Sequence, residues 1–246
     1  MPAAVYTRAR RWAGAARRAI RSRIPFAPRR PRPHRVRFGS LRRAEPISRS
    51  FGLDRGLPID RYYIEGFLAQ HAADIRGRVL EAGDARYTRK FGRERVTQSD
   101  VIDLRADNPK ATIVADLAAA PEIADETFDC VVLTQVLPFI PRLDAAMHEL
   151  HRILKPNGVL LVAVPGICQI SRYDAERWGD YWRFTSQGVE RLCDGIFPEA
   201  QVDAWGNVLA AIAFLHGLSV QELRQEELDA RDPDYQVVIT LRATRT

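Results

Sequence analysis

The sequence has few cysteines and no long apolar run, and each shortage excludes a class of protein. Its three cysteines, Cys130, Cys168 and Cys193, show no C-x-x-C spacing, which argues against a disulfide framework or a structural metal site. No apolar run approaches the roughly 20 residues that span a bilayer, and no signal-peptide segment follows the first basic residues. We therefore expect a soluble protein of a reducing, cytoplasmic compartment.

Acidic residues are nearly absent from the first 50 positions. Residues 1–50 hold 15 arginines, six prolines and one acid, Glu45, so their net charge is +14, whereas the whole chain carries +6. The prolines between Pro28 and Pro33 suit neither a helix nor a central strand. We predict a largely disordered, arginine- and proline-rich tail over residues 1–50 and one folded domain over residues 51–246.

The basic tail is open to three interpretations. It is either a solvated leader of arginine-biased composition, a segment that docks on an anionic membrane surface or partner, or a nucleic-acid-binding arm. Residues 6–24 place Trp12 and Ile20 among alanines and arginines, a pattern typical of a basic amphipathic helix. That pattern is compatible with a peripheral location at an inner membrane face. Nucleic acid is the least favoured partner because no aromatic platform accompanies the arginines.

From Phe51 onward, apolar segments alternate with helical patterns, as in a doubly wound parallel sheet. We predict a Rossmann-like α/β fold of about seven strands, the last of them antiparallel at the sheet edge. The expected strands cover residues 78–83, 95–102, 111–115, 128–134, 159–165, 201–205 and 235–243.

Capping patterns mark the expected helices. Asp60 is expected to cap a helix that Gly77 ends, and Thr185 or Ser186 to cap a helix over residues 184–197. An apolar stripe from Leu143 to Leu154 predicts a third helix, and Ser219 with Glu222 predicts a capping box for residues 220–228, shown by the spacing S-x-x-E.

The strand ends carry motifs that together resemble class I S-adenosylmethionine-dependent methyltransferases of the type 11 kind. The series begins with R-V-L-E-A-G and continues with I-V-A-D-L, F-D-C-V-V-L-T-Q-V-L and L-H-R-I-L-K-P-N-G-V-L-L-V-A-V-P. The resemblance is most specific over residues 128–165. Residues 171–185, S-R-Y-D-A-E-R-W-G-D-Y-W-R-F-T, resemble a subset of bacterial methyltransferases associated with glycan assembly.

The resemblance implies S-adenosylmethionine as the cofactor and assigns roles to the first strand ends. Glu81 and Gly83 match the acid and first glycine of the cofactor loop, where the carboxylate organises the loop amides and the cofactor's amino group. An acid after the second strand would accept both ribose hydroxyls, because two carboxylate oxygens match a vicinal diol. Asp100 is the first choice for that role, and Asp103 is the second.

Further cofactor contacts follow from the same resemblance. Asp116 matches the acid that accepts from the adenine amino group, and Leu117 would pack on the adenine ring. Gln135 falls where the methionine end of the cofactor is met. Arg61 and Tyr62, on the first predicted helix, either point toward a ligand carboxylate or serve as a surface arginine and a core tyrosine.

The cofactor loop departs from the family pattern. The usual loop reads acid-x-Gly-x-Gly-x-Gly, whereas Ala85 and Tyr87 occupy the second and third glycine positions. A tyrosine does not adopt glycine-only backbone angles cheaply, so we expect a loop with a different path, a cofactor placed differently or a loss of cofactor binding.

Aromatic and charged residues alternate in the segment after the fifth strand, where an acceptor would lie in this fold. Aromatic faces beside carboxylates suit a sugar, which stacks its C–H face on the ring and donates hydroxyl protons to the acids. The alternative is a structural knot with Trp182 in the core and Arg183 paired to an acid. Asp180 is the candidate base, and the candidate substrate contacts are Tyr173, Trp178, Tyr181, Trp182 and Arg183.

Taken together, the motifs predict a methyltransferase that O-methylates a saccharide or small-molecule acceptor. The missing glycines favour one alternative, a non-catalytic methyltransferase-fold scaffold or regulatory protein in polysaccharide assembly. A nicotinamide-dependent dehydrogenase is disfavoured because G-x-G-x-x-G is absent.

Overall fold

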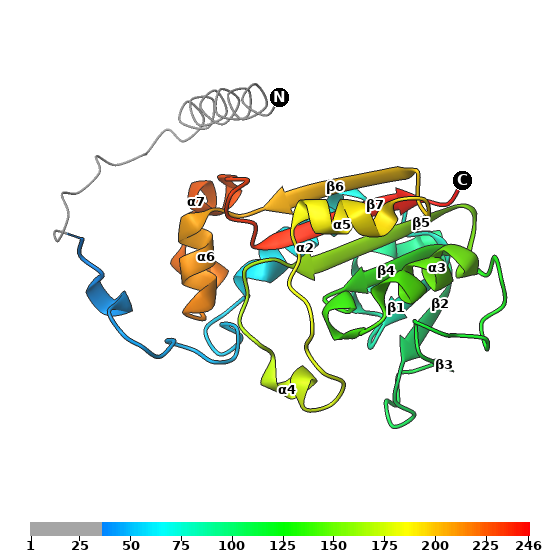
Figure 1. Ribbon diagram of the computed structural model, residues 1–246, viewed down its shortest axis with the longest axis horizontal. Coiled ribbons are helices and arrows are strands. Elements are labelled where there is room, and N and C mark those ends of the chain that lie inside the picture. The colour runs from blue at the N-terminus through cyan, green and yellow to red at the C-terminus, as the bar shows by residue number, and fades with distance from the viewer. Residues whose placement is uncertain (1–35) are drawn as a thin grey trace, which may run out of the picture. The chain divides into compact units, whose positions relative to one another are not determined.

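A computed structural model describes residues 36–246 of the chain (Figure 1). The first 35 residues of the expected tail, including the segment 6–24, lie outside the described part. Residues 46–246 form one compact unit, and the 3-10 turn η1 (Gly39–Leu41) belongs to the unit before it. Within residues 36–246 no helix has the length and apolar character needed to cross a membrane.

The folded unit is built on a seven-stranded mixed sheet, which confirms the expected fold class. The strand order is β3-β2-β1-β4-β5-β7-β6, and every strand except β7 runs in the same direction. The strands are β1 (Gly77–Ala82), β2 (Val96–Asp103), β3 (Ile113–Val114), β4 (Phe128–Thr134), β5 (Leu154–Pro165), β6 (Glu199–Trp205) and β7 (Val238–Thr244).

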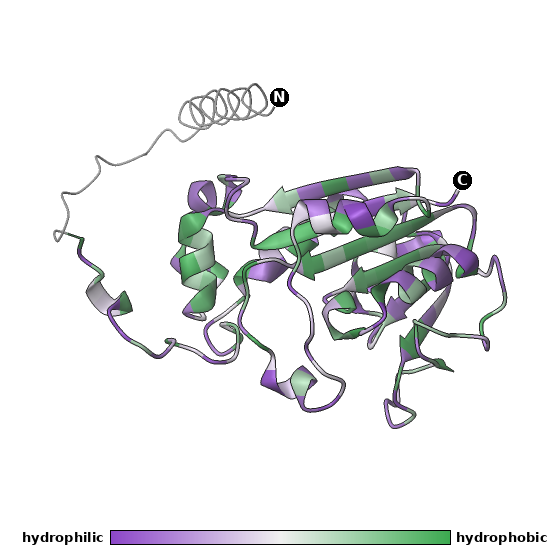
Figure 2. Cartoon of the chain, viewed as in Figure 1, coloured by the Kyte–Doolittle hydropathy of each residue, from purple (hydrophilic) through white to green (hydrophobic). Residues whose placement is uncertain are grey.

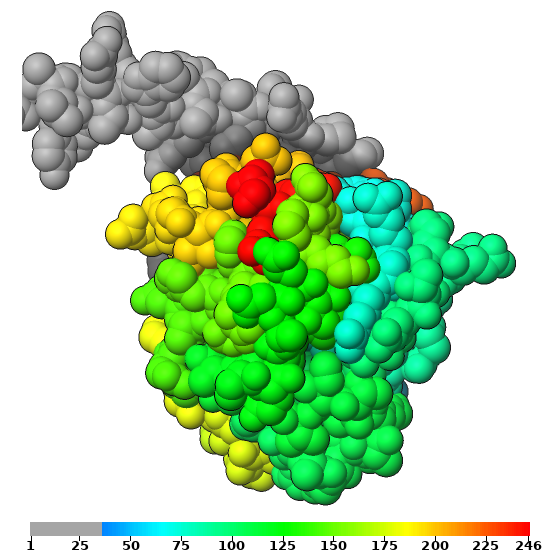
Figure 3. Space-filling view, turned by 90° about the vertical axis from the view of Figure 1, so that its right-hand side faces the viewer, coloured from blue at the N-terminus to red at the C-terminus, as the bar shows by residue number. Residues whose placement is uncertain are grey.

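The last strand is antiparallel, as expected, but its predicted position at the sheet edge is wrong. β7 lies between β5 and β6 and pairs with both along its whole length. Its first four residues, V-I-T-L, are buried, which suits a strand covered on both faces and paired on both sides. Figure 3 shows the end of the domain where the residues after β7 (red) lie beside the start of β5.

Two apolar cores cover the two faces of the sheet. On one face α3 (Leu143–Ile153) and α5 (Ser186–Cys193) pack against residues such as Leu80 and Val131. On the other face α2 (Ile59–Gln70), α6 (Val208–Leu215) and α7 (Gln225–Asp229) contribute residues to a core around Val79 and Val132, in the strands that Figure 2 colours green. The short elements are α4 (Arg172–Ala175), η2 (Thr88–Gly92), η3 (Arg93–Arg95), η4 (Leu137–Phe139) and η5 (Val220–Glu222).

The helix ends confirm some predicted caps and correct others. The Thr185 hydroxyl accepts from the amide of Gly188, and the Ser219–Glu222 capping box is present, although it opens η5 and α7 follows separately. Asp60 is not a cap, because α2 begins at Ile59 and the carboxylate of Asp60 is buried in its first turn. Gly77 begins β1 instead of ending α2.

Candidate active site

Two cavities meet at the carboxyl ends of the parallel strands. The strand-end cavity, of about 430 Å³, is lined by Gly83, Asp103, Leu104, Asp116, Leu117 and Trp178 among others. The charged cavity, of about 320 Å³, is lined by residues that include Asp60, Arg61, Tyr87, Cys168, Asp180 and Arg183. Gln135, Phe139 and Asp174 line both cavities, so these three residues mark the junction between them.

Glu81 organises the loop after β1 in the way the sequence predicts. Its buried carboxylate accepts from the backbone amides of Tyr87 at 3.0 Å and Thr88 at 2.7 Å. Burial raises the pKa of Glu81, and the hydrogen bonds from the loop oppose that shift. Gly83 has a φ of +74°, and a Cβ at this position would meet no atom within 4 Å. The loop therefore needs a glycine at this point and leaves open space in front of it.

Of the two acids on β2, the structure brings Asp103 to the cavity and not the first choice, Asp100. Strand β2 extends to Asp103, so Asp100 lies three residues, or about 10 Å, short of the carboxyl edge. The Asp100 carboxylate accepts from Arg78 at 2.7 Å and Thr112 at 3.1 Å, inside the sheet. The Asp103 carboxylate accepts from the amide of Arg105 and from the side chain of Asn108. Each Asp103 oxygen keeps a second lone pair for a ligand.

Asp116 and Leu117 lie together on the wall of the strand-end cavity, just after β3. One Asp116 oxygen accepts from the amide of Ala118 at 2.8 Å and so fixes the turn. The other oxygen is 3.8 Å from the guanidinium of Arg142. Leu117 is buried and presents an apolar surface beside this carboxylate. The pair offers an acceptor next to a flat apolar wall, as a purine would require.

The loop after β1, in which Ala85 and Tyr87 replace two glycines of the family pattern, follows a helical path. Tyr87 has helical angles, with φ −77° and ψ −35°, and the chain continues into the π-helical turn η2. Both Ala85 and Tyr87 are buried, and the Tyr87 ring stacks on Phe91 at 6.1 Å. The loop therefore accommodates Tyr87 without strained backbone angles.

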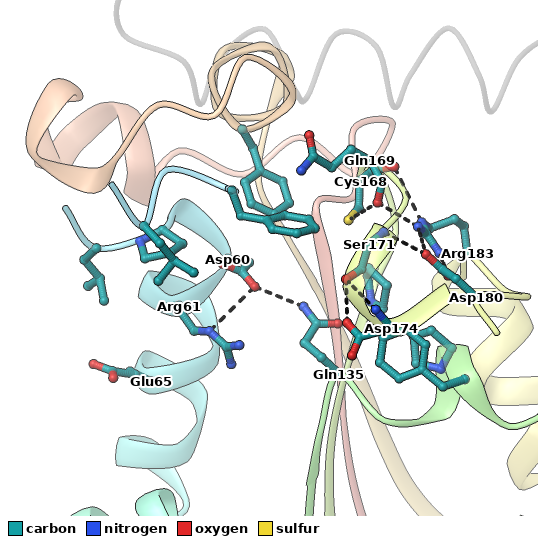
Figure 4. Close-up of a pocket in the computed structure, with 18 of the residues that line it drawn as sticks. Asp60, Arg61, Glu65, Gln135, Cys168, Gln169, Ser171, Asp174, Asp180 and Arg183 are labelled. Carbon is teal, nitrogen blue, oxygen red and sulfur yellow. Dashed lines mark hydrogen bonds and ion pairs between the residues drawn. The ribbon is translucent and has the colours of Figure 1, made fainter. Parts of the chain in front are cut away.

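Arg61 lines the charged cavity as predicted, whereas Tyr62 turns away from it. The Tyr62 hydroxyl donates to Asp229 at 2.6 Å, and burial together with this contact raises its pKa to about 12. A guanidinium nitrogen of Arg61 donates to the Tyr87 hydroxyl at 3.1 Å. Figure 4 shows Asp60 and Arg61 on the wall formed by α2, opposite Gln135.

Asp60 is a site residue that sequence reasoning interpreted only as a cap. Its side chain lines the charged cavity and accepts from the Gln135 side-chain amide at 3.2 Å. Burial raises the pKa of Asp60, and the neighbouring Arg61 opposes the shift. Gln135 has a φ of +59°, a conformation that is strained for a residue with a side chain and that concentrates at functional sites.

Most of the predicted aromatic platform does not reach a cavity. Tyr173, Tyr181 and Trp182 line neither cavity and are 63%, 52% and 41% exposed. The alternative interpretation of Trp182 as a core residue is also wrong, because the residue is exposed even though its indole nitrogen donates to the Ile140 carbonyl. Trp178 does line the strand-end cavity and packs edge-on to Tyr173. The short helix α4 and the turns around it set these orientations, which alternation in sequence does not reveal.

Asp180 and Arg183 form an ion pair on the wall of the charged cavity, which matches the structural alternative for this arginine. The carboxylate accepts two hydrogen bonds from Arg183 and one from the amide of Ser171, and only 2% of its side chain is exposed. These contacts lower the pKa of Asp180. A carboxylate held in this way is a weak proton acceptor, so Asp180 suits a positioning role better than the predicted role of base.

Asp174 is the second site residue that the sequence did not single out. It lies at the junction of the cavities and accepts from the Ser171 hydroxyl at 2.5 Å. Cys168 lines the charged cavity, but burial raises the pKa of its thiol to about 12, which leaves it protonated and poorly nucleophilic. Within residues 36–246, no cluster of three or more potential metal ligands is present.

A comparison with known protein families finds a match to part of the chain. Residues 65–162 match the family model described as a methyltransferase domain. The matched range runs from α2 through β5 and includes Glu81, Asp103, Asp116 and Gln135. The match agrees with the methyltransferase domain that the motifs predict.

Curated relatives resemble the chain over little more than half its length. The mitochondrial arginine-hydroxylase NDUFAF5 of Mus musculus is 27% identical over 147 residues, which cover 56% of this chain and 38% of that protein. The ubiquinone/menaquinone biosynthesis C-methyltransferase UbiE of Klebsiella pneumoniae is 27% identical over 164 residues, covering 57% and 63%. The chain thus spans less than two thirds of the length of these relatives.

Solved structures share the fold at low sequence identity. A methyltransferase dependent on S-adenosylmethionine from Mesorhizobium loti is 17% identical, with 79% of this chain and all of that chain covered and a TM-score of 0.52. One from Archaeoglobus fulgidus is 12% identical, with 75% and 94% covered and a TM-score of 0.51. These similarities support the observed strand arrangement.

Proposed function

We propose that the chain is an S-adenosylmethionine-dependent methyltransferase whose strand-end cavity holds the adenosine part of the cofactor. The observation that carries this proposal is the convergence of Gly83, Asp103, Asp116 and Leu117 on one cavity within the matched methyltransferase domain. Asp103 is assigned to the ribose hydroxyls, Asp116 to the adenine amino group and Leu117 to the ring face. Glu81 acts indirectly, by holding the loop amides.

The reacting atoms are assigned to the junction of the cavities. The cofactor supplies a methyl group on a positively charged sulfur, which is already activated for transfer. The protein then has to orient an acceptor in line and exclude water. Phe139 and Gln135 close the junction, and Asp174 is the carboxylate placed to take a proton from an acceptor hydroxyl or amine. Asp180 holds Arg183 on the wall of the acceptor side.

A saccharide or small polar molecule is the acceptor we favour, with O-methylation as the reaction. Support comes from the polar groups that line the charged cavity, among them Ser171, Asp180 and Arg183. A place in polysaccharide assembly rests on the resemblance of residues 171–185 alone. Assays with a panel of sugars, sugar nucleotides and small phenols, followed by mass spectrometry for a gain of one methyl group, would test the acceptor class.

Cofactor binding separates this enzyme from the scaffold alternative, which the replaced glycines at Ala85 and Tyr87 favour. Isothermal titration of the purified chain with S-adenosylhomocysteine, the demethylated product, should show one site per chain. Absence of heat and of a thermal shift at millimolar ligand would reject the enzyme and favour the scaffold. If the ligand binds, Asp174→Asn should lower kcat with little change in affinity for the product.

We also propose that the basic tail brings the protein to an anionic membrane surface. The support is the +14 charge of residues 1–50, because each arginine near an anionic surface adds about 1 kcal/mol of attraction. Full-length protein should float with vesicles of mixed phosphatidylcholine and phosphatidylglycerol at low salt. Protein lacking residues 1–45 should not, and equal flotation of the two would reject the proposal.

A further inference from the structure

The helix α6 presents its large apolar side chains to solvent. Its eight residues, V-L-A-A-I-A-F-L, include no polar side chain, and the helix is green in Figure 2. Val208, Leu209, Ile212 and Leu215 are 40–45% exposed, and their helical spacing places them on one face. The buried face consists of three alanines and Phe214. Burial of the branched side chains would stabilise the fold more than burial of alanines does, so this arrangement indicates a face kept for a partner.

The arginine-rich segment of the chain is attached beside one end of α6. The backbone amides of Ile47 and Ser48 donate to the carbonyl of His216, the residue that ends the helix, at 2.9 and 3.0 Å. Arg49 follows directly and is exposed, and residues 1–50 together carry a net charge of +14. The apolar face therefore lies next to the point where a strongly positive segment joins the folded unit.

The acids near the other end of α6 are held in contacts of their own. Asn207 caps the helix and donates to the carbonyl of Glu227 in the acidic helix α7 at 2.7 Å. The carboxylates of Glu226 and Glu227 pair with Arg224 at 3.6 and 2.6 Å. The carboxylate of Asp229 accepts from the hydroxyl of a tyrosine in α2. The C-terminal end of α6, beside the arginines, is thus the end suited to an anionic surface.

A second copy of the chain and a lipid surface are the two occupants that suit an apolar helix face. A stable protein interface buries about 800 Å² on each partner. Four residues that are each less than half exposed provide only part of that area. A lipid surface requires less, because a modest apolar contact and a polybasic segment together give stable binding where either alone is weak and reversible. The small face and the neighbouring charge therefore favour lipid.

We propose that α6 is the apolar half of a membrane contact, and that its exposed face enters the boundary between headgroups and acyl chains of an anionic bilayer. The arginine-rich segment supplies the electrostatic half by binding the headgroups. Ile212 and Leu215 contribute most, because they lie toward the end of α6 where that segment is attached. The inference rests on the membrane contact proposed for residues 1–50 and is independent of the methyltransferase assignment.

The exposed face of α6 continues into one wall of the charged cavity. Phe214, Phe51 and Leu53 line that cavity, and Leu53 is 67% exposed. The rings of Phe51 and Phe214 lie 6.1 Å apart. The Gln169 side chain, which also lines the cavity, donates to the carbonyl of Arg49 at 2.9 Å. A membrane at α6 would therefore lie close to the proposed acceptor side of the site.

Vesicle binding by the full chain tests the contribution of α6. Wild type, Ile212→Ser and Leu215→Ser are titrated at low salt with vesicles of mixed phosphatidylcholine and phosphatidylglycerol. Each substitution should weaken partitioning about 10-fold, because one apolar side chain no longer enters the lipid. The salt dependence of binding should stay as in wild type, because no charge is removed. Val114→Ser is the matched control: it removes a side chain that is 46% exposed on edge strand β3, and it should bind like wild type.

A fluorescent label on α6 tests insertion directly. Ile212→Cys and Val114→Cys each provide a thiol for a nitrobenzoxadiazole label. The new thiol reacts first, because Cys130 and Cys193 are buried and burial raises the pKa of the Cys168 thiol to about 12. On vesicles, emission from position 212 should rise and be quenched by phosphatidylcholine that carries a nitroxide on its acyl chain. Emission from position 114 should not change.

The outcomes separate the α6 contact from the tail contact and from a dimer. Quenching that is absent at position 212, or equal at the two positions, would overturn the α6 contact. Partitioning unchanged by both serine substitutions would also overturn it and leave the arginine-rich segment as the sole contact. A dimer in vesicle-free solution that Ile212→Ser dissociates would assign the face to a second copy. Unchanged thermal midpoints and S-adenosylhomocysteine affinities would show that the serine variants are folded, and the labelled variants decide if a midpoint falls.

Discussion

The strand-end cavity and the charged cavity differ in what creates them. Most residues that line the first lie at the carboxyl ends of β1, β2, β3 and β4, whose positions follow from the parallel sheet itself. The second adds side chains of α2 and more of residues 168–183, which reach the site from outside the sheet. The shape of the strand-end cavity therefore depends chiefly on the sheet, whereas that of the charged cavity depends on how α2 and residues 168–183 pack beside it.

The largest effect is expected at Gly83, which lines the strand-end cavity and has open space in front of it. Gly83→Val would place a side chain in the open space in front of the loop and should abolish binding of both S-adenosylhomocysteine and 5′-methylthioadenosine. The positive φ should also cost about 1–3 kcal/mol of stability. Gly195→Val is the matched control, with a φ of +75°, no atom near the added Cβ and a place outside both cavities. Binding that fell equally in the two variants would show that strain alone is responsible.

The two acids of β2 separate ligand binding from folding. Asp103→Ala should weaken adenosine ligands by about 1.5–3 kcal/mol, because a charged acceptor is lost at the cavity. Asp100→Ala should leave that affinity unchanged and lower the free energy of unfolding by about 1–3 kcal/mol, because Arg78 and Thr112 lose their partner. Titration and denaturant unfolding of both variants measure the two quantities. A larger binding loss for Asp100→Ala would restore the assignment that the sequence favoured.

The Asp180–Arg183 pair offers a test in the charged cavity that depends on pH. Arg183→Met should destabilise the fold by about 1–3 kcal/mol at pH 7, because it leaves a buried carboxylate without its guanidinium. The pair lowers the pKa of Asp180, so its contribution is present above the unfolded value of about 4 and is lost as the pH falls through the lowered pKa. The free energies of unfolding of wild type and variant, measured by chemical denaturation, should therefore converge in acid. A difference between these free energies that stayed constant to low pH would contradict this account.

Trp178 should give the smallest effect, because it covers the strand-end cavity without a hydrogen bond to the ligand. Trp178→Ala should weaken S-adenosylhomocysteine and 5′-methylthioadenosine alike, by about 1 kcal/mol of lost stacking and burial. Acceptor KM measured at saturating cofactor is the second readout. A large rise in that KM with unchanged ligand affinity would move Trp178 to the acceptor side and support the predicted aromatic platform.

Sequence analysis predicted the features that depend on the spacing of apolar residues and on the positions where parallel strands end. The apolar runs of β4 and β5 and the acids Asp103 and Asp116 follow from the rule that parallel strands end at a common edge. Sequence analysis missed the place of Asp60 in the cavity, because an acid in the first turn of a helix can either cap the helix or face a site. Only the tertiary contact with Gln135 decides between these two roles. The outward orientation of Tyr173 and Tyr181 depends on turns around α4 that carry no periodic signal.

The central place of β7 has a consequence for how the chain reaches its native state during synthesis. β6 is joined to the rest of the sheet only through β7, the last of the seven strands to leave the ribosome. The first five strands can pair as they emerge, whereas β6 and the exposed edge of β5 must wait. An incomplete chain therefore presents an apolar strand edge that pairs readily with other chains, a recognised cause of aggregation. Released chains truncated before Val238 should accordingly depend on chaperones far more than released chains that extend through Thr244.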